Sequence, residues 1–163
     1  MKKNNFLRRF LFPAVIAVTS LVLVSCDKDD DLEDDPNQDR TYVLSGSASG
    51  NQEIPIVTTT ATGTLTGTYV SAINTLTYNI TWTGLSGNVT AMHFHGPATS
   101  SQEAGPIHSL TISSNGTAGT STGTLILADS TEQHLLAGKI YYNIHTALNP
   151  DGEIRGQVTA TAN

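Results

Sequence analysis

The chain has 163 residues, a formal net charge of −6 at pH 7 and only one cysteine. A single cysteine excludes a framework of intrachain disulfides. Nucleic-acid binding depends on lysine and arginine side chains that neutralise phosphate charge, so this acidic chain is not expected to bind nucleic acid.

Residues 1–25 have the pattern of an export signal. A basic start is followed by an apolar run from residue 10 to residue 24, which is typical of a signal peptide and not of the mature fold. The run ends in Leu-Val-Ser-Cys, which resembles the lipobox of bacterial lipoproteins. That resemblance implies that Cys26 becomes the acylated first residue and anchors the protein in a membrane. The alternative is that Cys26 is an ordinary hydrophobic residue at the end of the signal.

Residues 26–40 join this cysteine to the rest of the chain. Eight acidic residues lie between residues 27 and 40, and such a block repels itself and is expected to form a disordered tether. Lys28-Asp29-Asp30 resembles the short signal that follows the acylated cysteine of surface-exposed lipoproteins in the Bacteroidetes group. The resemblance implies an outer-membrane protein that faces the outside, and the alternative is a plain solvated spacer.

Residues 41–163 are long enough for one domain with one core. Polar and apolar residues alternate through residues 73–82, where Leu76, Tyr78, Ile80 and Trp82 fall on one face. This period of two predicts a half-buried strand of an antiparallel sheet. Similar segments predict seven further strands, at residues 41–49, 62–70, 89–95, 107–112, 121–127, 139–146 and 153–162.

Eight short strands separated by turn residues predict an all-β fold, a single antiparallel Greek-key β-sandwich or barrel. One interruption has helical character. Ser130 and Gln133 have the spacing of a capping box, and Gly138 is placed to end a helix. We expect no more than a turn or two of helix there.

The stretch MHFHGP places His93 and His95 two residues apart. Residues two apart on a strand share a face, so Met92 and Phe94 are expected in the core and the two histidines on the outer face of the sheet. The same alternation in residues 139–146 turns His145 outward. Three imidazoles would therefore converge if these two strands are neighbours.

Three neutral imidazoles suit copper or zinc, at metal–nitrogen distances of about 2.0–2.1 Å. His108 is a candidate fourth donor, although its alternation with Leu110 points it inward. The competing interpretation is that exposed sheets carry histidines without any metal.

Three stretches resemble the CHRD (chordin) domain family: NQEIPIVTTTATGTLTG, AMHFHGPATSSQEAGPI and LLAGKIYYNIHTALNPDGEIRGQV. The resemblance covers essentially residues 41–160. The family takes its name from extracellular chordin proteins, which antagonise bone morphogenetic proteins in animals, and its bacterial members are secreted or lipid-anchored without a settled activity. A growth-factor role is not implied for a bacterial lipoprotein.

The motif positions of the family other than the histidines fall on residues with structural explanations. Pro97 and Gly152 are expected in turns, and Gly156 at a point where backbones pack closely. Glu153 and Arg155 share the outer face and are placed to pair with each other across a neighbouring strand. The full set is Glu53, Pro55, Gly96, Pro97, Asn149, Gly152, Glu153, Arg155 and Gly156.

Two hypotheses follow. In the first, the domain holds copper, or alternatively zinc, on His93, His95 and His145. In the second, it is a non-enzymatic adhesion module that binds an extracellular protein or glycan without metal, because the sequence shows no nucleophile with a paired base and no close carboxylate pair. A looser likeness to copper-zinc superoxide dismutases, which also have His-x-His on a strand, makes dismutase or other copper redox activity a minor alternative. Histidine rings that face away from one another would favour the adhesion module.

Overall fold

The computed structural model describes residues 40–163, which lie in a compact unit formed by Asp34–Asn163. The predicted signal peptide, Cys26 and nearly all of the acidic tether lie outside the described residues. Within residues 40–163, no helix is long and apolar enough to cross a membrane.

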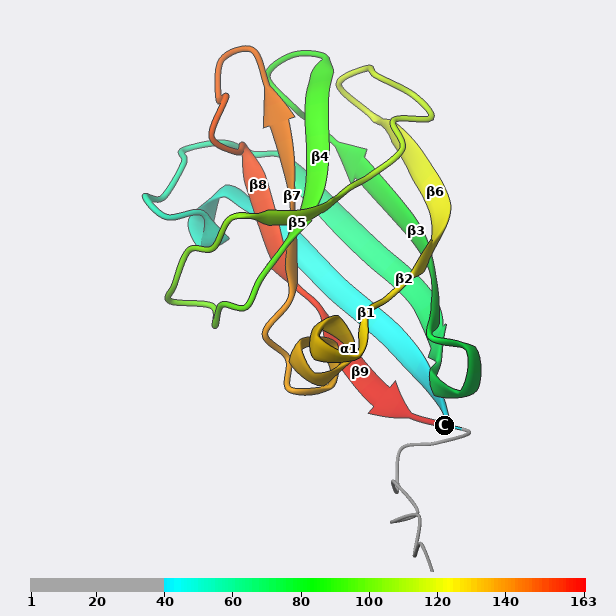
Figure 1. Cartoon of the computed structure of the whole chain (residues 1–163). Coiled ribbons are helices and arrows are strands. Elements are labelled where there is room, and N and C mark those ends of the chain that lie inside the picture. Colours follow the sequence, from blue (N-terminus) through cyan, green and yellow to red (C-terminus); the bar gives the residue numbers. More distant parts are fainter. Residues whose placement is uncertain (1–39) are drawn as a thin grey trace, which may run out of the picture. The chain divides into compact units, whose positions relative to one another are not determined.

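The described residues form one antiparallel sheet that curls into a half-barrel, with little helix (Figure 1). Neighbouring strands follow the order β5-β4-β7-β8-β1-β2-β3-β6, and β9 pairs with β1. The all-β prediction is confirmed. The strands are β1 (Thr41–Ser49), β2 (Thr62–Val70), β3 (Thr75–Thr83), β4 (Val89–His95), β5 (Pro106–Ser109), β6 (Gly119–Ile126), β7 (Tyr141–Thr146), β8 (Ile154–Gln157) and β9 (Thr159–Ala162).

The described part of the chain has nine strands where the sequence predicted eight, because the last predicted strand is interrupted at Val158. Before this residue β8 pairs with both β7 and β1, and after it β9 pairs with β1. At the interruption, the Val158 N–H donates to the carbonyl of Ile140, and the buried Val158 side chain joins the core. Alternation alone does not reveal where the pairing with β7 ends.

The predicted helical stretch is present as α1 (Asp129–Leu136), but its start differs from the prediction. Ala128 is the N-cap and makes no side-chain capping bond, so the capping box expected at Ser130 and Gln133 does not form. Gly138 adopts a positive φ of 65° beyond the helix end, as expected of a terminating glycine. Two short 3-10 turns, η1 (Gly50–Gln52) and η2 (Ser71–Ile73), were not predicted.

The core fills the concave face of the curled sheet. The alternating residues of β3, namely Leu76, Tyr78, Ile80 and Trp82, are all buried there, as are Met92 and Phe94 of β4. The rings of Tyr78 and Phe94 meet edge to face, with centroids 5.7 Å apart. The residues predicted for the core of these two strands therefore lie in it.

The segment after β5 reaches back to the far side of the curled sheet. The Thr111 N–H donates to the hydroxyl of Tyr78 on β3 at 3.1 Å, and the Ser121 hydroxyl on β6 donates to the Thr111 carbonyl. Polar contacts thus connect the two ends of the strand order, with no strand pairing between β5 and β6.

Candidate metal centre

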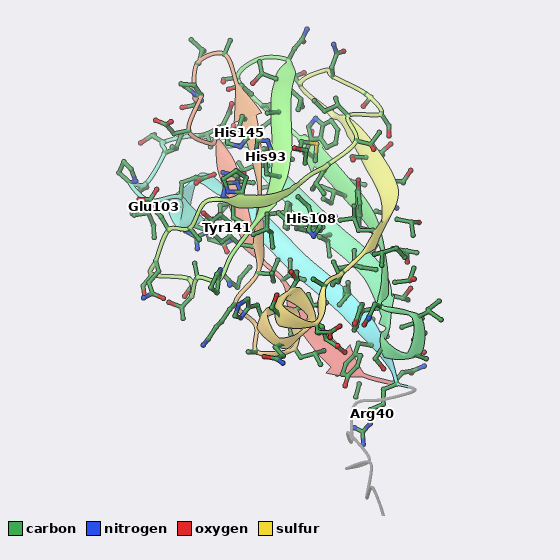
Figure 2. The ribbon with its side chains drawn as sticks, viewed as in Figure 1. Arg40, His93, Glu103, His108, Tyr141 and His145 are labelled. Carbon is green, nitrogen blue, oxygen red and sulfur yellow. The ribbon has the colours of Figure 1, made fainter. Side chains whose placement is uncertain are left out.

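Strands β4 and β7 are neighbours, which brings the three histidines of the sequence motif together. Ala91 pairs with His145 and His93 with Asn143, and side chains of paired residues point to the same face of a sheet. His93, His95 and His145 therefore lie on the face opposite Met92 and Phe94. Figure 2 shows His93 and His145 close together.

The ring nitrogens of these three histidines converge. One nitrogen from each ring can be chosen so that the three atoms lie within 4.8 Å of one another. The ring centroids of His93 and His145 are 4.9 Å apart, and those of His93 and His95 are 5.6 Å apart. Two nitrogens on one ion lie at most about 4.1 Å apart, twice a bond length, so small ring movements of under about 1 Å suffice to bind one ion.

Backbone carbonyls orient two of the three rings. Nδ1 of His95 lies 2.8 Å from the carbonyl oxygen of Ala104, and Nδ1 of His145 lies 2.9 Å from that of Pro150. A carbonyl oxygen only accepts, so each Nδ1 carries the proton and each Nε2 is unprotonated, with its lone pair available as an acceptor or a metal ligand. Metal-binding histidines are commonly held in this way, with the other ring nitrogen donating to a carbonyl or carboxylate.

His93 completes the cluster through a contact with the ring of His145. Its Nδ1 lies 3.1 Å from Nε2 of His145, and it donates because the His145 nitrogen is the acceptor. Nε2 of His95 is buried and makes no hydrogen bond of normal geometry with the described residues. A buried nitrogen without a well-formed hydrogen bond is costly, and an ion between the rings would use its lone pair.

The rings are far less exposed than the sequence suggested. They lie on the predicted outer face, but His95 is only 8% and His145 only 7% exposed, while His93 is half-buried. Burial is the main cause that lowers the pKa of all three, and the pKa of His93 is lowered further by the neighbouring His145. The imidazoles are accordingly neutral at pH 7, the form that binds metal.

Tyr141 and Arg155 form a stack against the ring of His95. The Tyr141 ring stacks on His95 at 4.8 Å with 14° between the planes, and the Arg155 guanidinium lies 3.6 Å above the centre of the same tyrosine ring. The hydroxyl of Tyr141 also donates to the Ala104 carbonyl that orients His95. The sequence analysis missed this role, although the alternation that turns His145 outward places Tyr141 on the same face of β7.

The loop between β4 and β5 covers this stack and is bound to the sheet by two side chains of β8. Arg155 Nη2 donates to the carbonyls of Thr99 at 2.9 Å and Gln102 at 2.8 Å. Gln157 Nε2 donates to the carbonyl of Ala98 at 2.9 Å. The loop that provides the Ala104 carbonyl is thereby fixed over the histidines.

The predicted pairing of Glu153 with Arg155 on an exposed face is wrong. Both side chains are buried, and Arg155 instead binds loop carbonyls. Glu153 accepts hydrogen bonds from the backbone and hydroxyl of Ser86 and from the hydroxyls of Thr59 and Thr146. The prediction failed because loops cover this face, so each charged group binds the loop nearest to it.

Glu53 lies at the other end of the site, against the turn that orients His145. Burial raises the pKa of Glu53 to about 7, although the Arg155 charge opposes the shift. A side chain at Gly152, which has a φ of 131°, would come within 2.5 Å of Glu53 Oε1 and 2.8 Å of Asn143 Nδ2. Glu53 and Pro55 also line a cleft of about 200 Å³ with residues 148–152.

The remaining motif residues have structural roles. Strand β4 ends at His95, so Gly96 and Pro97 form the predicted turn, and a side chain at Gly96 would meet the Lys139 carbonyl at 2.9 Å. A side chain at Gly156 would meet the Ser47 carbonyl at 2.7 Å, which confirms the close packing expected there. Asn149 closes the turn after β7 through its backbone bonds with Thr146.

His108 does not join the cluster. It pairs with Phe94 across β4 and β5, so it projects to the same side as that core residue and away from His93 and His95. The three-histidine group found within residues 40–163 does not include it, and Figure 2 shows it apart from His93 and His145. The candidate fourth donor is therefore set aside, in agreement with its inward alternation.

Comparison with known proteins gives a family but no close relative. The family model described as the CHRD domain matches residues 44–158. No curated protein and no solved structure matches the chain. Since the matched residues make up well over half of the sequence and include all three clustered histidines, the chain belongs to the CHRD domain family.

Proposed function

We propose that this CHRD domain binds a single copper ion through His93, His95 and His145. The observation that carries the proposal is the convergence of one nitrogen from each ring within 4.8 Å. Two of these rings are already in the tautomer that leaves Nε2 free, because Nδ1 faces a backbone carbonyl. His93 needs only to move its proton from Nδ1 to Nε2 to offer the third nitrogen.

The donor set favours copper over most other metals. All three donors are neutral imidazoles, and no cysteine or carboxylate belongs to the group found in the described residues. Imidazole suits copper and zinc, whereas carboxylate-rich sites suit magnesium, calcium and manganese. Copper(II) also binds nitrogen ligands more strongly than zinc does, in the usual order of divalent metals. Zinc is the alternative ion.

Metal titration of the segment 34–163 tests this proposal. Purified metal-free protein is expected to take up about one Cu(II) per chain, with nitrogen hyperfine structure in its EPR spectrum. A His145→Ala variant should lose this uptake, while His108→Ala, which changes a histidine on the opposite face, should retain it. Unchanged uptake in the His145→Ala variant would refute a site built from the three rings, and a competition titration with Zn(II) decides between the two ions.

The location of the domain is a second part of the proposal. Lipid attached at Cys26 and an acidic tether over residues 27–40 would hold the metal site at the outer face of a membrane. The support is the lipobox-like stretch together with the acidic block. Incorporation of a labelled fatty acid into the full chain, lost in a Cys26→Ala variant, tests the anchor. Protease digestion of intact cells tests which side the domain faces.

A metal-free adhesion module is the second candidate, and one observation favours it. Strands β2 and β3 present threonine side chains on their exposed face, with the hydroxyls of Thr64 and Thr81 2.7 Å apart and those of Thr68 and Thr77 2.8 Å apart. Neither strand contains a charged residue, so this face suits an uncharged protein or glycan. Binding to such a partner that persists in the presence of a chelator would support this role. An adhesion module, however, does not require the three histidine rings to converge.

A further inference from the structure

The two terminal strands of the curled sheet differ in how their free edges are protected. β5 has four residues, begins at Pro106, and meets β4 with a register shift at Phe94 and His95. Short length, proline and irregular pairing are devices that prevent a sheet edge from pairing with another chain. β6 has eight residues and contains no proline and no charged residue, so it lacks these devices.

The backbone groups on the open edge of β6 can be assigned from its hydrogen bonds. The N–H of Leu127, just after the strand, donates to Asn74 on the β3 side, and that of Thr120 donates to Ser114 on the other side. Since N–H groups alternate sides along a strand, those of Thr122, Thr124 and Ile126 also point away from β3.

Residues 40–163 cover only the first part of this edge. Ser114 binds the Thr120 N–H, and Thr111 accepts from the Ser121 hydroxyl, so the segment after β5 covers the start of β6. Beyond it, Thr122 and Thr124 are exposed and Ile126 is 67% exposed. In Figure 1, β6 forms the margin of the sheet next to β3. The open edge therefore runs from residue 122 to residue 126.

We propose that two copies of this chain associate by antiparallel pairing of the open edges of β6. A twofold axis at Thr124 would place each Thr124 opposite its counterpart and each Thr122 opposite Ile126. The outward N–H and carbonyl groups then form three hydrogen-bonded pairs with two bonds each. Such an interface uses the same patch on both copies and closes as a dimer.

Electrostatics permit this approach despite the negative net charge of the chain. β6 and its neighbour β3 contain no acidic or basic residue, so no like charges face each other across the axis. The short edge makes a weak dimer in solution. Anchoring both copies in one membrane would raise their effective concentration and favour the pair.

Sedimentation velocity of the segment 34–163 over increasing concentration tests the pairing, with metal-free protein, so that the result is independent of the metal site. A reversible monomer–dimer equilibrium is expected. Thr124→Pro removes the central outward N–H, and proline is tolerated where a strand N–H faces away from the sheet. This variant should remain monomeric at concentrations where the original protein is dimeric. Thr124→Val, which keeps the N–H, should dimerise like the original protein.

The Thr124→Lys variant provides a second disruption if the proline variant does not fold. It would place two ammonium groups opposite each other, and should also be monomeric while its far-UV circular dichroism is unchanged. A dimer that survives in both Thr124→Pro and Thr124→Lys uses another surface and overturns the proposal. If the original protein is monomeric at every concentration, the proposal is overturned as well. The open edge of β6 would then be available to an extended segment of a different protein.

Discussion

Nδ1 of His93 lies 3.1 Å from Nε2 of His145, a residue 52 positions later in the chain. Two nitrogens this close suit adjacent positions on a single ion, whose bonds are about 2.0–2.1 Å long. Binding of copper to the folded protein alone should stabilise it, by about 2.7 kcal/mol at a free metal concentration one hundred times Kd. Thermal unfolding with increasing Cu(II) should therefore show a rising Tm.

The same scan with Mg²⁺ serves as a control, because magnesium prefers oxygen ligands. The Tm of a His95→Ala variant should rise much less with Cu(II) than that of the original protein. A copper-induced rise of equal size in both proteins would mean that the ion binds elsewhere.

Arg155 fixes the loop over the histidines, so its replacement should loosen the site without touching a metal-binding ring. Arg155→Lys keeps the charge but loses the planar group stacked on Tyr141 and one of its two loop bonds. The free energy of unfolding in urea should fall by about 1.5–3 kcal/mol, the usual contribution of a hydrogen bond to a charged group. Amide hydrogen exchange of residues 99–104 should become faster. Unchanged exchange in this loop would contradict the role of Arg155 as its anchor.

The strands and the shared outward direction of the three histidines were predictable from the sequence, because both follow from alternation. Alternation within β4 turns His93 and His95 outward, and alternation within β7 does the same for His145. The family motif includes residues of both strands. The three rings were expected to converge only if β4 and β7 are neighbours, and the two strands do pair in the sheet.

Burial of the site was not predictable in the same way. Alternation tells which face a side chain occupies, but not whether a distant loop covers that face. The loop that contains Ala104 is held over His95 by side chains from other strands, among them Arg155 and Gln157 of β8, which bind its carbonyls. For the same reason Glu153 appeared exposed, although it is enclosed by Ser86, Thr59 and Thr146. These contacts depend on tertiary structure that no local pattern encodes.

Glu53 should make the protein less stable as pH rises from about 4.5 to about 7. Its pKa in the fold is about 7, raised by burial from the ordinary value of 4.5, so the folded protein holds a proton that the unfolded chain releases. The corresponding stability is fully present below about pH 4.5 and declines up to about pH 7. Urea unfolding between pH 5 and 8 should show this decline, and Glu53→Gln, which stays neutral, should reduce the slope. An identical slope in the variant would show that other groups cause it.

Glu153 should have the opposite effect. Burial alone would raise its pKa, but hydrogen bonds from Ser86, Thr146 and Thr59 outweigh burial and hold it below the ordinary value. Its contribution is therefore present above about pH 4.5 and is lost as pH falls below that value. Glu153→Gln should cost about 1–2 kcal/mol at pH 7, where it replaces charge-assisted hydrogen bonds with neutral ones. Urea titrations at pH 7 and pH 3.5 should show the difference from the original protein shrinking in acid.

Gly152 is the residue that allows the turn after β7 to lie against Glu53. At its φ of 131° a side chain is strained, and a Cβ atom would come within 2.5 Å of Glu53 Oε1. Gly152→Ala should therefore destabilise the protein by about 1–3 kcal/mol. It should also weaken copper binding, because the carbonyl of Pro150, two residues earlier in the same turn, orients His145. Gly87→Ala is the matched control, since a side chain there would meet no atom within 4 Å. Measured copper affinity should fall for Gly152→Ala and stay unchanged for Gly87→Ala. Equal affinities in the two variants would show that this turn does not influence the metal site.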